Sequence, residues 1–106
     1  MIIDAHTHVY PERIAEKAVA KLERASGVPA NTNGLKSGLL ASMKEAGIDY
    51  SVLLPVATSG KQVDSINREA AETNETGSET GLFSFGGIHP DTANYKEVLR
   101  GIQESA

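Results

Sequence analysis

The segment IIDAHTHVYP, residues 2–11, places two of the three histidines of the chain one residue apart, at the end of an apolar run. The pattern predicts a β-strand over residues 2–9, and residues two apart on a strand project from the same face, about 6.6 Å apart along the strand. Asp4, His6 and His8 are therefore expected on one face. Two imidazoles at this spacing can converge on one cation, at metal–nitrogen distances of about 2.0–2.1 Å.

The composition fits a single folded domain. The chain has 106 residues, of which 40% are hydrophobic and 23% are charged, close to ordinary globular proteins. The net charge is −4 and the basic residues are scattered, so nucleic acid is not an expected partner. Because the chain has no cysteine, a metal ion must be held by His, Asp or Glu. No segment resembles a membrane span or a signal peptide, so we expect a cytoplasmic protein with no membrane partner.

Beyond the first strand, apolar runs alternate with amphipathic stretches. The pattern predicts helices over residues 11–25, 35–46, 61–75 and 95–102, and further strands over residues 50–57 and 82–88. Gly47 follows the second helix, at the place where a left-handed C-terminal cap is common. Buried strands separated by helices indicate the α/β class, with a parallel sheet wound in the right-handed sense.

His6 and His8 are the candidate metal ligands because they end a predicted parallel strand, where α/β proteins bind their ligands. Asp4 lies deeper in that strand, and we expect it to orient a ligand rather than to bind the metal itself. His89 follows the third predicted strand on the same rim and is a candidate for substrate binding. The alternative for His89 is a loop residue that fixes the Gly-Ile-His-Pro turn by hydrogen bonding. The sequence identifies no catalytic acid or base.

Three segments together resemble the metal-dependent amidohydrolase superfamily, and in particular the enzymes similar to aminocarboxymuconate-semialdehyde decarboxylase. They are DAHTHVYP (residues 4–11), LLASMKEAGIDYSVLLPVAT (residues 39–58) and FSFGGIHPD (residues 83–91). The resemblance implies that residues 1–106 form the N-terminal (β/α)3 segment of a TIM (β/α)8 barrel. It also implies a divalent metal, commonly zinc, with His6 and His8 among its ligands. A metal-activated water would then hydrolyse a C–N or related bond of a small-molecule substrate. Some relatives carry out decarboxylation on the same scaffold.

The chain is short for this family, since a complete barrel of this type needs about 250 residues. Two imidazoles are also fewer than the three protein ligands typical of a catalytic zinc site. We therefore expect an N-terminal portion of a longer enzyme. Alternatively, the open edge of the third strand pairs with a second copy in a homo-oligomer, or the chain is a small independent domain with relic histidines.

Other functions are compatible with the histidine pair. A phosphoesterase similar to the polymerase-and-histidinol-phosphatase family also begins with His-x-His, but it usually carries a further histidine after the second strand. The stretch YSVLLPVATSG, residues 50–60, has none. A TatD-like metal-dependent nuclease shares His-x-His together with a later Gly-x-His-Pro. A non-catalytic module that assembles through its exposed sheet edge is the alternative from another class.

Overall fold

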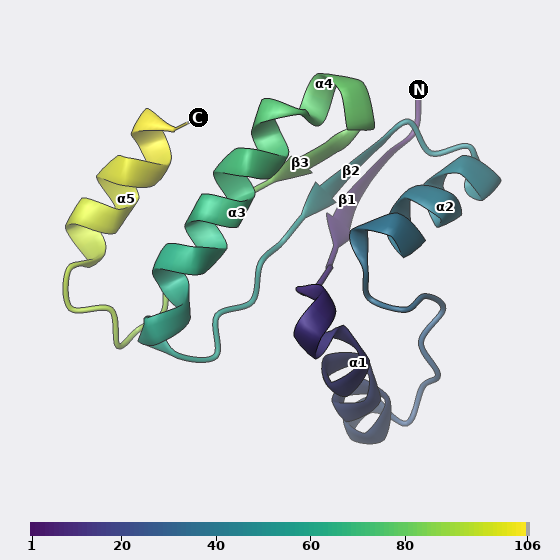
Figure 1. Ribbon diagram of the computed structural model, residues 1–106, viewed down its shortest axis with the longest axis horizontal. Helices are drawn as coiled ribbons and strands as arrows, with labels where there is room; N and C mark the ends of the chain where they lie inside the picture. Colours follow the sequence, from purple (N-terminus) through teal and green to yellow (C-terminus); the bar gives the residue numbers. More distant parts are fainter. Residues whose placement is uncertain (106) are drawn as a thin grey trace.

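Three parallel strands form the sheet on which the fold is built (Figure 1). The computed structural model describes residues 1–105. The strands are β1 (Ile3–Thr7), β2 (Tyr50–Leu53) and β3 (Leu82–Ser84), in the order β1-β2-β3. This confirms the predicted α/β class and parallel sheet. All three strands end earlier than the sequence pattern predicted, and the strand that carries the histidines lies at an edge of this sheet.

The helices follow the predicted order, with one addition. They are α1 (Glu12–Ser26), α2 (Lys36–Ala46), the 3-10 turn η1 (Gly60–Gln62), α3 (Val63–Glu75), α4 (Gly77–Thr80) and α5 (Tyr95–Glu104). Gly47 ends α2 with a φ of 69°, the left-handed cap that was expected. The short helix α4 was not predicted, because its sequence GSET is polar and has no apolar period.

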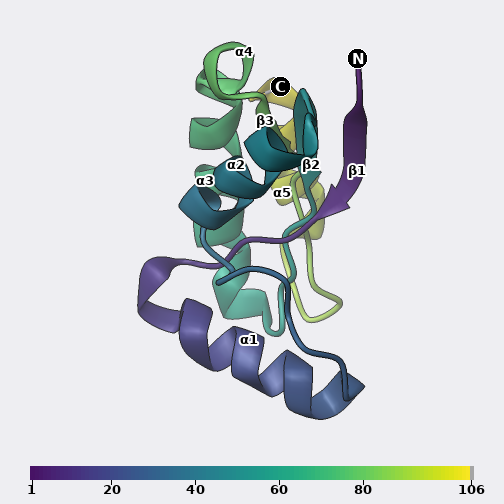
Figure 2. The ribbon, with the colours of Figure 1, turned by 90° about the vertical axis from the view of Figure 1, so that its right-hand side faces the viewer.

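The two faces of the sheet differ in their environment. Helices α2 and α3 lie on one side of the strands (Figure 2). The pairs Ser51–Leu82 and Leu53–Ser84 share a face because partners in a parallel ladder project to the same side. Leu53 is only 4% exposed, so this is the face that the helices cover. The opposite face carries Phe83, which keeps 39% of its surface exposed. The buried hydrophobic residues are Ala15, Met43, Leu53, Val63, Ala70 and Leu82.

Side chains of α3 close part of the outer edge of β3. Ser84 donates its backbone N–H to Oδ1 of Asn74 (2.7 Å), and its carbonyl accepts Nδ2 of the same side chain (3.0 Å). Seven residues earlier on the helix, Asn67 makes the same pair of bonds with the backbone of Gly87 (2.7 and 2.9 Å). Thr80 accepts the N–H of Leu82 at 3.2 Å. The edge that the sequence suggested would be open is therefore partly capped within the chain.

Candidate metal centre

The imidazoles of His6 and His8 converge. Their Nε2 atoms lie 3.0 Å apart, and the ring centroids are separated by 4.9 Å at an interplanar angle of 76°. Two nitrogens bound to one tetrahedral zinc ion would be about 3.3 Å apart, given metal–nitrogen distances near 2.05 Å. A small outward rotation of the rings would therefore open this pair to the separation that one cation requires. Both residues are exposed, at the carboxyl end of β1.

A backbone carbonyl fixes the orientation of His8. Its Nδ1 lies 2.7 Å from the carbonyl oxygen of Leu54, the residue that follows β2. Because a carbonyl oxygen can only accept a hydrogen bond, Nδ1 of His8 carries the proton, and Nε2 of the neutral ring keeps a lone pair that accepts the Nε2–H of His6 at 3.0 Å. Metal-ligating histidines are commonly held in this way through their other ring nitrogen. Sequence reasoning missed Leu54 because the group that acts is a carbonyl, which every residue possesses.

The strict alternation expected from Asp4 to His8 is interrupted. Asp4 pairs with Ser51, and Thr7 pairs with Leu53. The two paired residues are three positions apart on β1 but only two positions apart on β2. The register therefore shifts between Asp4 and Thr7, where β1 carries one residue more than β2, as in a β-bulge. Asp4 and Thr7 therefore both lie beside the buried residues of β2, so the strict alternation expected along residues 4–8 does not hold.

Asp4 contacts the backbone of His6 rather than its ring. Its Oδ1 accepts the His6 backbone N–H at 3.2 Å. Thr7 is held on β2 by two bonds: its carbonyl accepts the N–H of Leu54 at 2.9 Å, and its hydroxyl donates to the carbonyl of Val52 at 2.9 Å. The bulged segment is thus fastened on both sides of His6.

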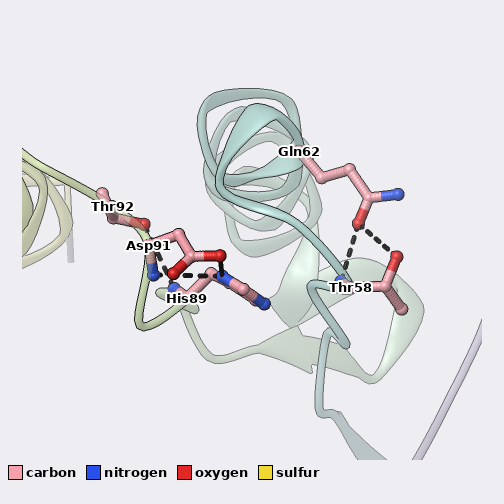
Figure 3. A network of polar contacts seen from close by, with 5 residues as sticks. All are labelled: Thr58, Gln62, His89, Asp91 and Thr92. Carbon is pink, nitrogen blue, oxygen red and sulfur yellow. Dashed lines mark hydrogen bonds and ion pairs between the residues drawn. The ribbon is translucent and has the colours of Figure 1, made fainter.

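The polar contacts of His89 lie within its own turn (Figure 3). Its Nδ1 accepts the backbone N–H of Asp91 at 3.2 Å, and its carbonyl accepts the N–H of Thr92 at 2.9 Å. The ring is 21% exposed. These bonds match the alternative in which His89 fixes the Gly-Ile-His-Pro turn, and its role in substrate binding stays a prediction. A neighbouring loop is closed by Thr58, which donates to Gln62 Oε1 through both its N–H (2.8 Å) and its hydroxyl (3.1 Å).

The histidine pair has no third partner of the usual kinds within residues 1–105. No group of three or more His, Cys, Asp or Glu side chains there could hold a metal ion. A cavity of about 130 Å³ lies beside the carboxyl end of β2, and Tyr10, Lys36 and Ile66 are among the residues that line it, whereas His6 and His8 do not. The pair supplies two nitrogen ligands on an exposed surface, one short of a catalytic zinc site.

Comparison with known proteins found no matching family model, no similar curated protein and no similar solved structure. No helix within residues 1–105 is both long enough and apolar enough to cross a membrane.

Proposed function

We propose that this chain is part of a metal-dependent hydrolase of the amidohydrolase type, in which His6 and His8 are two ligands of a divalent cation. The observation that carries the proposal is the 3.0 Å approach of the two Nε2 atoms, combined with the bond from His8 Nδ1 to the Leu54 carbonyl. An imidazole whose Nδ1 is already committed to a carbonyl presents Nε2 to a metal without a change of tautomer.

The residues present fit a cation held by nitrogen. Imidazole nitrogen suits zinc, and no thiolate is available since the chain has no cysteine. A bound zinc ion supplies a water that is activated for attack on a carbonyl near neutral pH. The remaining ligands would come from later strands of a longer barrel, because a catalytic zinc site uses three protein ligands and this chain provides two.

The topology supports the barrel part of the proposal. Successive parallel strands that lie side by side in chain order are the arrangement from which a (β/α)8 barrel is built. His6 and His8 lie at the carboxyl end of β1 and the Leu54 carbonyl at that of β2, which is the end at which barrel enzymes place their active sites.

Decarboxylation of a small carboxylic acid is the alternative on the same scaffold, because it uses the same pair of histidines. The two reactions are distinguished by measuring their products, because hydrolysis releases an amine or an alcohol whereas decarboxylation releases carbon dioxide.

Calorimetric titration with zinc tests the proposal. We expect one zinc ion per chain, bound more weakly than in a three-ligand site, with binding abolished by His6→Ala and by His8→Ala. His89→Ala is the matched control and should leave the affinity unchanged, because the contacts of His89 lie within its own turn. A folded chain that binds no zinc, or one whose affinity survives His6→Ala, would overturn the proposal.

A further inference from the structure

We propose that Asp4 is a positioning residue that holds the backbone of His6 in the β-bulge and thereby aims the His6 imidazole at that of His8. This inference rests on the proposed metal pair and adds a role for a residue outside the coordination sphere. It differs from a carboxylate that orients an imidazole, because the acceptor atom of Asp4 faces a backbone N–H.

The bulge is the structural reason for the proposal. Between the paired residues Asp4 and Thr7, β1 carries one residue more than β2 does. Bulges change the direction of a side chain and are frequent beside active sites. Here the irregular segment between Asp4 and Thr7 contains the candidate ligand His6, whose N–H donates to Asp4 Oδ1 at 3.2 Å. An acidic side chain that accepts the N–H two residues later is a local turn motif that competes with regular strand pairing.

The downstream side of the bulge is fastened independently of Asp4. Thr7 is tied to β2 through the Val52 carbonyl and the Leu54 N–H, both at 2.9 Å. The backbone carbonyl of the same Leu54 accepts a hydrogen bond from His8 Nδ1 at 2.7 Å. His8 is therefore fixed relative to β2, and the position of His6 depends on the short segment that Asp4 holds.

Three roles for Asp4 make different predictions. A direct ligand, or a carboxylate that attracts the cation, needs the negative charge. A backbone clamp needs only an acceptor oxygen, which asparagine retains at Oδ1. The observed geometry favours the clamp, because within residues 1–105 no carboxylate joins the two histidines in a metal-binding group.

The test compares zinc affinity in Asp4→Ala and Asp4→Asn. We expect Asp4→Ala to weaken zinc binding about tenfold or more, as for other residues that support metal ligands, and Asp4→Asn to stay within about threefold of the original chain. Equal losses in both variants, or no loss in either, would overturn the clamp. Thr73→Val is the control for a general effect on folding, because it removes a buried hydroxyl from α3. It should lower stability without changing zinc affinity.

A measurement without metal separates this inference from the proposed function. The amide hydrogen of His6 should exchange with solvent about tenfold faster in Asp4→Ala than in the original chain or in Asp4→Asn. If the original chain binds no zinc, the metal site is refuted, and His6 exchange still decides whether Asp4 is a clamp. Unchanged exchange in Asp4→Ala would refute the clamp even where zinc binds.

Discussion

At the scale of single residues, backbone groups organise the histidine pair. The Leu54 carbonyl holds His8 at Nδ1, and Asp4 Oδ1 accepts the backbone N–H of His6 where the register of β1 shifts. Neither effect requires a charged partner for the imidazoles. The His6 ring contacts His8 through the 3.0 Å bond between the Nε2 atoms, the His8 ring is also held by the Leu54 carbonyl, and Asp4 holds the His6 backbone.

Ser51 provides a prediction at this scale. Its hydroxyl is fully buried, at 0% exposure, and has no hydrogen-bond partner among residues 1–105. A buried polar group without a partner costs free energy on folding. Ser51→Ala should therefore raise the free energy of unfolding by about 1 kcal/mol, measured by urea denaturation.

Ser84→Ala is the matched control on the same face of the sheet. Its hydroxyl contacts the carbonyls of Leu53 (3.4 Å) and Phe85 (3.1 Å), so its removal should lower stability slightly. A Ser51→Ala variant that is more destabilised than Ser84→Ala would contradict this prediction, because it would show that the Ser51 hydroxyl is hydrogen-bonded in the folded chain.

At the scale of elements, α3 both covers the sheet and caps its edge. Asn67 and Asn74 are seven residues apart and so lie on the same side of the helix, two turns from each other. Each side chain replaces the bonds that a neighbouring strand would make with Gly87 or Ser84. Exposed strand edges promote association with other chains, and natural proteins commonly block them. This capping argues against association of separate chains through β3 at Ser84, whereas in the proposed barrel the following strand would replace these side-chain bonds.

Asn74→Ala tests the cap. It removes both side-chain bonds to Ser84, which are partly buried, and should lower the free energy of unfolding by about 1–3 kcal/mol. The variant should also associate more readily in size-exclusion chromatography, because the edge of β3 becomes free to pair.

Asn94→Ala serves as the comparison, since Asn94 is exposed and makes no side-chain capping bond to α5. We expect a change within about 0.5 kcal/mol. Equal effects of the two substitutions would show that the Asn74 bonds contribute nothing to the edge.

At the scale of the whole molecule, the surface is large for the chain. The accessible surface is 7580 Å², whereas a compact protein of this mass exposes about 5,700 Å². The radius of gyration is 14.3 Å, against about 13 Å for a compact domain of this length. Part of the excess is apolar, as Ile3 on the uncovered sheet face is 55% exposed. This apolar surface is what a barrel interior would bury, and it is consistent with the proposed role as part of a larger structure.

Hydrophobic periodicity was sufficient to predict the order of helices and strands and their parallel arrangement. It was also sufficient to select His6 and His8 as neighbours, because residues two apart on a strand are close in any register. The bulge could not be predicted, since it depends on which residues of β2 stand opposite Asp4 and Thr7. The edge cap was equally hidden, because Asn67 and Asn74 look like surface residues until their backbone partners are known.

The most direct test of the central claim is a long-range proton–nitrogen NMR spectrum of the three histidine rings, recorded with and without zinc. We predict that His8 carries its proton on Nδ1 in the metal-free chain, that zinc shifts Nε2 of both His6 and His8, and that the His89 ring is unchanged. A spectrum in which His8 is protonated on Nε2 alone, or in which zinc shifts only one of the two rings, would contradict the shared metal site.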